Sequence, residues 1–239
     1  MKVKYRVMDP TGNITILVGT EVEIKYQPSV AARLMEIEPS AEQVGFVGGG
    51  GMCDIALRMA GGEFCGNAAM SAAVAAALDA GEKNAKITVL VSGAEDPVEA
   101  LVQQNSDGSW NAAVNMPRPA GIKKIVLKDG PAGKREAAAV EFKGISHIIT
   151  EDEIFKDRAE ELIKQWCADL KADGLGIMFL DAQGCRMTPL VYIPAAGTLF
   201  WESSCASGTC AAGVYLAAQC CEHLNRALIL EEEAARARN

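Results

Sequence analysis

The segment Gly61-Gly62-Glu63-Phe64-Cys65-Gly66-Asn67-Ala68-Ala69-Met70 decides the fold that we predict for this chain. From Ala68 to Ala80 the residues are strong helix formers, and Gly81 follows where a helix C-cap is expected. The spacing i, i+4, i+8 predicts a buried helix face made of Met70, Val74 and Leu78. Cys65 should therefore lie at a helix N-terminus, where unpaired N–H groups favour a thiolate.

A second segment repeats this pattern near the end of the chain. It reads Ser203-Ser204-Cys205-Ala206-Ser207-Gly208-Thr209-Cys210-Ala211-Ala212-Gly213. Again a cysteine and small residues precede an apolar helix, whose buried face we expect at Val214, Ala218 and Cys221. The repetition predicts two similar domains, 1–116 and 117–239, with the boundary at Pro117-Arg118-Pro119.

Strands predominate between the two cysteine helices, so the predicted class is α+β. We expect strands at 2–9, 14–19, 43–47, 54–59, 87–92, 98–103, 110–116, 122–128, 137–142, 176–180 and 187–193, and helices at 30–36, 151–173 and 222–239. The run Gly48-Gly49-Gly50-Gly51 has no Gly-Lys-Ser/Thr ending and no helix after it. It therefore predicts a hairpin turn rather than a phosphate loop.

Composition excludes several functional classes. The 239 residues carry a net charge of -8, which argues against nucleic-acid binding. Residues 1–7 alternate like a strand rather than a signal peptide, and no segment reaches the roughly 20 apolar residues of a membrane span. We expect a cytoplasmic protein without a membrane partner.

The eight cysteines are expected to be thiols, because disulfide frameworks belong to small secreted domains. Cys53, Cys167 and Cys185 fall in ordinary strand or helix patterns, where a buried cysteine acts as a small hydrophobe. No Cys-x-x-Cys pair occurs, and His147 and His223 are the two histidines of the chain. We therefore predict no metal site.

Together the two cysteine motifs resemble those of the cofactor-independent amino-acid racemases and epimerases of the diaminopimelate epimerase fold. Cys65-Gly66-Asn67 is similar to the first motif of that family, and Cys205-Ala206-Ser207-Gly208-Thr209 to the second, with Ala206 in place of a glycine. Thr11-Gly12-Asn13 and Gly144-Ile145-Ser146-His147 resemble two further family segments in the same order. The resemblance implies that each domain is a curved, mostly antiparallel sheet around a central helix.

The resemblance also implies a chemistry and a set of site residues. One cysteine would take the α-proton of an amino acid as thiolate, and the other would return a proton as thiol, with no cofactor. Cys65 and Cys205 are the catalytic candidates. The substrate-binding candidates are Asn13, Gly66, Asn67, His147, Glu202, Ser207, Gly208 and Thr209. Each of these eight also has a structural alternative, as a turn, helix-start, loop or strand-end residue.

Several alternatives remain open for the substrate and the partner. Diaminopimelate epimerases carry a Glu-Arg pair where this chain has Ala196 and Gly197, which points to another amino acid, with histidine as one candidate. A diaminopimelate epimerase with altered distal recognition is the second hypothesis, and a silent binding protein of the same fold is the third. Glu202 is the candidate to select a cationic or imidazole side chain. A small-molecule amino acid is the expected partner, with a second copy of the chain as the protein partner.

Overall fold

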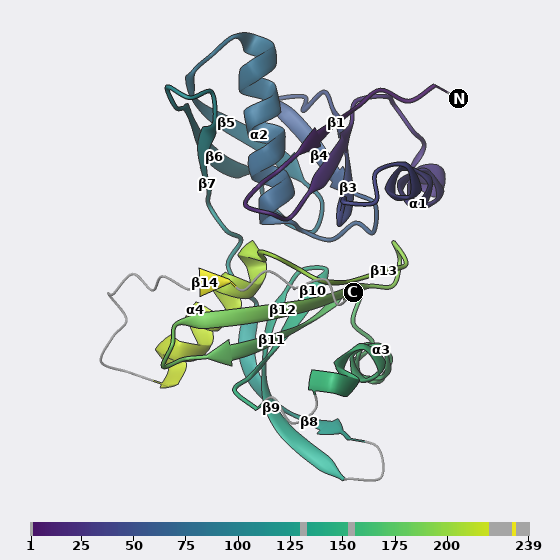
Figure 1. The fold of residues 1–239 in the computed structure, drawn as a ribbon, viewed down its shortest axis with the longest axis vertical. Coiled ribbons are helices and arrows are strands. Elements are labelled where there is room, and N and C mark those ends of the chain that lie inside the picture. The colour runs from purple at the N-terminus through teal and green to yellow at the C-terminus, as the bar shows by residue number, and fades with distance from the viewer. Residues whose placement is uncertain (1, 130–132, 153–155, 220–230, 233–239) are drawn as a thin grey trace. The chain divides into compact units, whose positions relative to one another are not determined.

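The computed structural model describes residues 2–129, 133–152, 156–219 and 231–232 (Figure 1). The chain divides into two compact units. The first comprises Met1–Pro117 with Ala195–Gly197, and the second comprises Arg118–Pro194 with Thr198–Asn239. Within the described residues, each unit contains one sheet and two α-helices, which gives an α+β fold, as predicted.

The sheet of the first unit follows the strand order β1-β2-β3-β4-β5-β6-β7. Neighbouring strands are antiparallel except for the pairs β2–β3 and β4–β5, which are parallel. The strands are β1 (Tyr5–Met8), β2 (Thr15–Val18), β3 (Gln43–Gly48), β4 (Ile55–Met59), β5 (Asn84–Val91), β6 (Val98–Gln104) and β7 (Trp110–Val114). The hairpin predicted around the four glycines is confirmed, because β3 and β4 pair antiparallel across it.

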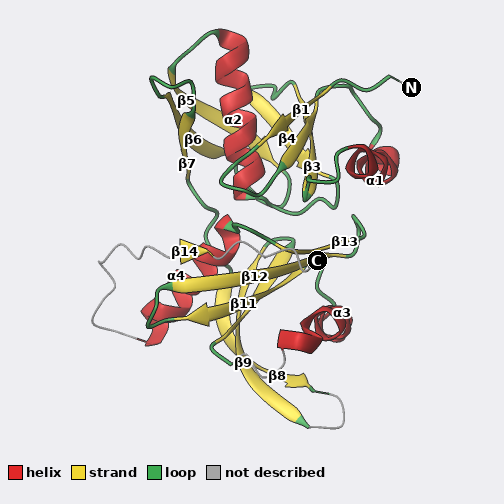
Figure 2. Ribbon diagram, in the orientation of Figure 1, coloured by secondary structure: helices red, strands yellow, loops and turns green. Residues whose placement is uncertain are grey.

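Helix α2 (Gly66–Ala80) packs on strands of this sheet, and Figure 2 shows it as a long helix against them. Its alanines 68, 69, 72, 73 and 77 are fully buried, since small side chains let the helix approach the strands closely. Gly81 ends the helix with a φ of 71°, as predicted. The predicted Met70-Val74-Leu78 face is wrong in part: Val74 is buried but Leu78 is 46% exposed, because alanines form the contact face.

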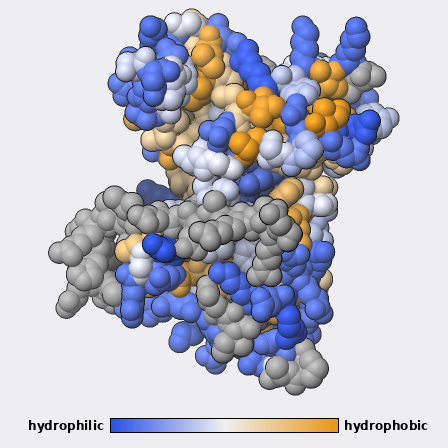
Figure 3. Space-filling view, viewed as in Figure 1, coloured by the Kyte–Doolittle hydropathy of each residue, from blue (hydrophilic) through white to orange (hydrophobic). Residues whose placement is uncertain are grey.

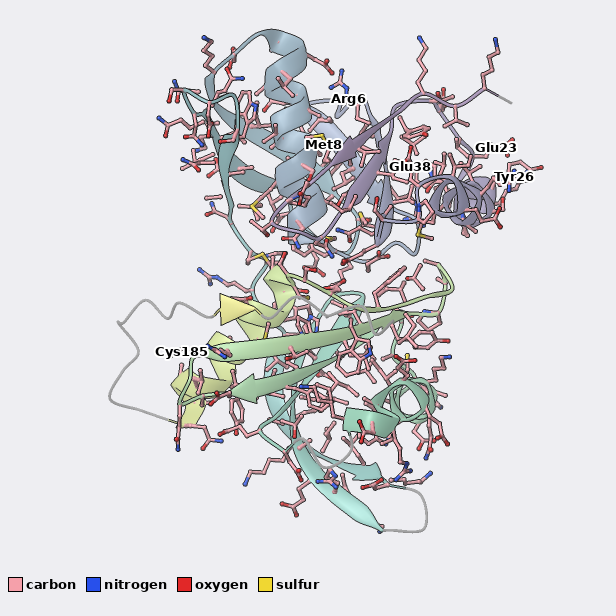
Figure 4. All side chains as sticks on the ribbon, in the orientation of Figure 1. Arg6, Met8, Glu23, Tyr26, Glu38 and Cys185 are labelled. Atoms are coloured by element: carbon pink, nitrogen blue, oxygen red, sulfur yellow. The ribbon has the colours of Figure 1, made fainter. Side chains whose placement is uncertain are left out.

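Helix α1 (Gln27–Ile37) follows the 3-10 turn η1 (Ile24–Tyr26) and packs on β3. It begins three residues before the predicted start, with Pro28 in its first turn, where proline costs no hydrogen bond. Arg6 lies on β1 beside α2 and forms an ion pair with Asp79 at 2.5 Å (Figure 4). On the face of this unit shown in Figure 3, hydrophobic residues (orange) are interspersed with hydrophilic residues (blue).

The sheet of the second unit follows the order β13-β12-β11-β10-β9-β8, and β14 (Glu231–Glu232) also pairs with β12. The pairs β10–β11 and β12–β14 are parallel and the others are antiparallel. The strands are β8 (Gly121–Lys128), β9 (Lys134–Phe142), β10 (Ile145–Thr150), β11 (Leu175–Asp181), β12 (Arg186–Ile193) and β13 (Thr198–Trp201). Helix α3 (Ala159–Leu170), preceded by η3 (Lys156–Arg158), packs on β11 and β12, and α4 (Ala206–Gln219) packs on β9, β10 and β11.

The second unit departs from the sequence prediction in several places. Strands β10 and β13 were not predicted, and the helix predicted from 151 to 173 is shorter, since β10 runs to Thr150 and α3 begins at Ala159. The predicted face of α4 is wrong: Val214 is half-buried and Ala218 exposed, while Ser207, Gly208, Ala211 and Ala212 are buried. Cys221 and most of the predicted terminal helix lie outside the described residues, and Glu231–Glu232 form a strand instead.

The same succession of elements occurs in both units. In the first, β2 and β3 are parallel and joined by α1, β4 returns antiparallel to β3, and the cysteine helix α2 follows. In the second, β10 and β11 are parallel and joined by α3, β12 returns antiparallel to β11, and α4 follows after β13. The prediction of two similar halves, each with a mostly antiparallel sheet and a central helix, is therefore confirmed.

Candidate active site

Cys65 is the N-cap residue of α2. Its backbone is extended (φ -131°, ψ 114°), and its Sγ accepts a hydrogen bond from the Ala68 N–H at 3.4 Å. This is the geometry in which a cap side chain satisfies an otherwise unpaired helix N–H. The sulfur therefore lies at the positive end of the helix dipole, as the sequence predicted.

A polar network from the neighbouring strands meets the same sulfur. Cys65 Sγ donates to Gln43 Oε1 at 3.0 Å. Gln43 Nε2 in turn donates to Thr15 Oγ1 at 2.8 Å and to Asn13 Oδ1. Asn13 Nδ2 donates to Glu42 Oε2 at 2.6 Å. The amides of Gln43 and Asn13 thus join a carboxylate at one end to the thiol at the other.

The segment before Cys65 lies close to Ser92 and Gly93. Ser92 Oγ donates to the Glu63 carbonyl at 2.8 Å and accepts from the Met59 N–H at 3.0 Å. A Cβ at Gly93 would lie 2.1 Å from the Phe64 nitrogen. The Gly93 backbone also has a φ of 71°, which favours glycine. Burial raises the pKa of the Glu63 carboxyl, although the positive charge of Arg58 opposes this shift.

Cys205 directly precedes the first residue of α4 and is 6% exposed. Its Sγ accepts from the Gly208 N–H at 3.4 Å, the same contact three residues along the helix that Cys65 makes with Ala68. The Ser207 hydroxyl lies 3.6 Å from this sulfur. Cys205 therefore lies among groups that are able to donate hydrogen bonds.

His147 of β10 lies behind Ser207. Its Nε2 is 2.8 Å from Ser207 Oγ, and its ring packs edge-on to Phe142 with ring centres 5.9 Å apart. The side chain is fully buried, and burial lowers its pKa from 6.5 to about 3, so the imidazole is neutral at pH 7. Within the described part of the chain, Nδ1 has no hydrogen-bond partner. A neutral imidazole either donates to or accepts from Ser207, according to its tautomer.

Gly176 on the adjacent strand β11 provides the space for this ring. A Cβ there would lie 2.2 Å from His147 Nδ1. His147 and Gly176 are register partners in the parallel pair β10–β11. Gly176, Gln43 and Thr15 were not predicted as site residues. Gln43 did carry a signal, since it is a polar residue at the start of an otherwise apolar strand.

The remaining candidates take different positions. Asn67, Gly66, Ser207 and Gly208 are buried in the first turns of their helices. Asn13 is 1% exposed, with its amide in the network behind Cys65. The Thr209 hydroxyl donates to the Cys205 carbonyl at 3.0 Å. Glu202 follows β13, and its N–H donates to the Pro189 carbonyl at 3.0 Å. The first unit thus groups Asn13, Gly66 and Asn67 with Cys65, and the second groups His147, Ser207 and Gly208 with Cys205.

The other described cysteines differ from these two. Cys167 is buried on α3, and burial raises the pKa of its thiol. The expectation of an ordinary buried position is wrong for Cys185, which is exposed in the turn between β11 and β12 with a φ of 52° (Figure 4). Cys53 is half-buried in the turn before β4. Among the described residues, no cluster of three or more His, Cys, Asp or Glu side chains is arranged to hold a metal ion.

Two glycines of α4 provide a matched pair of variants. A Cβ at Gly208 would lie 2.3 Å from Met178 Sδ and 3.2 Å from Cys205 Sγ, whereas a Cβ at Gly213 would meet nothing within 4 Å. We expect Gly208→Ala to displace the Cys205 sulfur and lower kcat at least about tenfold. Gly213→Ala should keep activity and stabilise the protein by about 0.5–1 kcal/mol. Activity assays and urea unfolding of both variants test this, and equal activities would contradict it.

No helix in the described ranges is long and apolar enough to cross a membrane. The fold resembles those of solved proteins at low sequence identity. A PhzF-family phenazine biosynthesis protein from Bacillus anthracis superposes with a TM-score of 0.57 at 12% identity, covering 91% of this chain and 81% of that one. A predicted epimerase from Pseudomonas aeruginosa gives 0.55 at 14% identity, covering 87% and 77%. These likenesses concern the fold alone.

Sequence comparison identifies the family. The model described as "Histidine racemase CntK N-terminal domain" matches residues 2–229, which span both units. A histidine racemase from Fusobacterium nucleatum is 35% identical and covers 95% of this chain and 87% of that protein. A histidine racemase from Staphylococcus aureus is 28% identical and covers 89% and 79%. The chain therefore belongs to the histidine racemase CntK family, and it is an isomerase that racemises an amino acid.

Proposed function

We propose that this racemase acts on histidine without a cofactor and uses Cys65 and Cys205 as its two proton carriers. The observation that carries the proposal is the recurrence of one arrangement in both units. Each cysteine directly precedes a helix, and its Sγ accepts a backbone N–H from three residues along that helix. The names of the relatives at 35% and 28% identity supply histidine as the substrate.

The reaction needs one thiolate and one thiol. The thiolate takes the proton from the α-carbon, and the resulting carbanion takes a proton from the thiol on its other face. The product leaves with inverted configuration, and the two cysteines have exchanged their protonation states. N–H groups at a helix start also stabilise negative charge. Those of Gly66, Asn67 and Ser207 remain the proposed donors to the substrate carboxylate, while the Gly208 N–H already donates to Cys205 Sγ at 3.4 Å.

His147 is proposed to act on Cys205 through Ser207. If Nε2 carries the ring proton, it donates to Ser207 Oγ, and the serine hydroxyl is left to donate to a Cys205 thiolate. If Nδ1 carries it, Nε2 accepts from Ser207, and the serine oxygen is left to accept from a Cys205 thiol. The contacts of 2.8 Å and 3.6 Å allow both arrangements. A neutral histidine thus accommodates both protonation states of the sulfur.

The charge of the substrate side chain bears on the choice of amino acid. Ala196, at a position where diaminopimelate epimerases carry a charged pair, packs against the hydrophobic cluster around Ile16 and Val44. Neither it nor Gly197 offers a cation for a distal carboxylate, which supports a substrate other than diaminopimelate. Glu202 is the proposed partner of the imidazole ring of the substrate.

The test follows deuterium during racemisation in deuterated water. Starting from L-histidine, the first D-histidine formed should carry deuterium at the α-carbon while the remaining L-histidine keeps its proton. This asymmetry is expected because the base and the acid are different groups. NMR combined with chiral chromatography measures both pools. Early deuterium in both enantiomers, or loss of activity on treatment with hydroxylamine to trap pyridoxal phosphate, would refute the proposal.

A further inference from the structure

The hydrogen bonds behind Cys65 run in one direction. The direction is set by Glu42, because its carboxylate oxygen accepts a hydrogen bond. Asn13 therefore presents Nδ2 to Glu42 at 2.6 Å, which leaves its Oδ1 facing Gln43. Since that oxygen accepts, Gln43 presents Nε2 to it.

Thr15 fixes the same orientation of Gln43 from a second direction. Its hydroxyl donates to the Asn13 carbonyl at 3.1 Å, so its oxygen is left to accept from Gln43 Nε2 at 2.8 Å. A flipped Gln43 amide would place its oxygen against Asn13 Oδ1, and both groups would lose a partly buried hydrogen bond. Gln43 Oε1 is thereby held 3.0 Å from Cys65 Sγ.

The two sulfurs consequently meet opposite partners. Cys65 faces an amide oxygen, which accepts a hydrogen bond from a thiol and repels a thiolate. Cys205 faces the Gly208 N–H and the Ser207 hydroxyl, both of which are able to donate to a thiolate. The Ala68 N–H donates to Cys65 as well, so the helix-start contact is common to both cysteines. The Gln43 oxygen at Cys65 and the Ser207 hydroxyl at Cys205 distinguish the two sulfurs.

We infer that Gln43 is a positioning residue that keeps the proton on Cys65 in the resting enzyme and makes Cys205 the resting thiolate. The inference rests on the proposed role of the two cysteines. After a turnover that uses Cys205 as base, Cys65 is the thiolate and faces the Gln43 oxygen. That state is disfavoured, so Cys65 recovers a proton from water and Cys205 releases one, which restores the resting form.

The test is the pH profile of thiol alkylation by iodoacetamide, followed for each cysteine by peptide mass spectrometry without substrate. In the unmodified protein, the midpoint for Cys65 should lie above that for Cys205. Gln43→Met removes the acceptor at similar size, and we expect the Cys65 midpoint to fall by about 0.7 pH unit, a factor of about five. Gln43→Glu places a carboxylate there, and the Cys65 midpoint should rise.

If Gln43 controls the proton, the Cys65 midpoint shifts in opposite directions in the two variants. Structural damage would instead shift the Cys65 midpoint in the same direction in both variants. The Cys205 midpoint in the same samples is the internal control, and Gln103→Met, at an exposed position of β6, is the matched variant. Three other ionisable residues around Cys65 are unchanged in every variant: Glu42, Arg58 and Glu63. A Cys65 midpoint at or below that of Cys205 in the unmodified protein overturns the inference, even if neither variant folds. Since no substrate is present, this result is independent of the deuterium experiment.

Discussion

Replacing either Cys65 or Cys205 with serine is expected to lower the rate of the proposed histidine racemisation by about 1,000-fold or more. A serine hydroxyl is too weak an acid to supply the anion that removes the α-proton, and general acid–base catalysis by one group contributes roughly 100- to 10,000-fold. Serine keeps an oxygen for the helix N–H that the sulfur accepts at 3.4 Å in both units, so the fold should persist. Initial rates from both enantiomers measure the loss.

Cys185→Ser is the matched control, because Cys185 is an exposed turn residue that belongs to neither the Cys65 nor the Cys205 group of site residues. It should racemise histidine at the rate of the unmodified protein. Thermal unfolding of all three variants should agree within a few degrees. A Cys65→Ser or Cys205→Ser variant that keeps a tenth of the activity would show that the corresponding thiol is not a proton carrier.

Acid should destabilise the protein through His147. The pKa of this buried imidazole is about 3 in the folded protein, against 6.5 for an ordinary histidine. Between these values the unfolded chain binds the proton and the folded protein does not, so stability falls as the pH falls below 6.5. The slope approaches 1.4 kcal/mol per pH unit, which amounts to about 3 kcal/mol between pH 6.5 and pH 4.

Urea unfolding across this pH range, in parallel with His147→Gln, isolates the effect. The carboxylates titrate in both proteins, so they cancel in the difference between the two free energies of unfolding. The variant is expected to be less stable at pH 7, because it loses the packing against Phe142. As the pH falls, its free energy of unfolding should decrease less than that of the unmodified protein. A difference that stays constant from pH 7 to pH 4 would contradict the assignment of His147 as a buried neutral group.

The sequence predicted the two cysteine helices well because their signals are local. A cysteine before small residues specifies the start of each helix, and a run of alanines with the Gly81 C-cap specifies the rest of α2. The buried faces were harder, since Leu78 is apolar and yet 46% exposed, while alanines make the contacts of α2. A periodicity rule that favours large side chains misses a face built from small ones.

The residues that contact the cysteines were harder to predict from the sequence. Gln43 reaches Cys65 from a strand 22 residues away, and Gly176 matters only because β10 and β11 pair in parallel beside His147. The strand that carries His147 was itself missed, because it is almost wholly buried and shows no alternation of polar and apolar residues. Such contacts depend on strand pairing, which a single sequence specifies weakly.

The unequal burial of the two cysteine helices bears on how the family can vary. Ten residues of α2 are buried, and alanine and glycine make up most of them, so nearly any larger replacement would collide with the sheet. In α4 the described buried residues are confined to its first half. Evolutionary drift should therefore accumulate along the later turns of α4, while α2 stays restricted to small side chains.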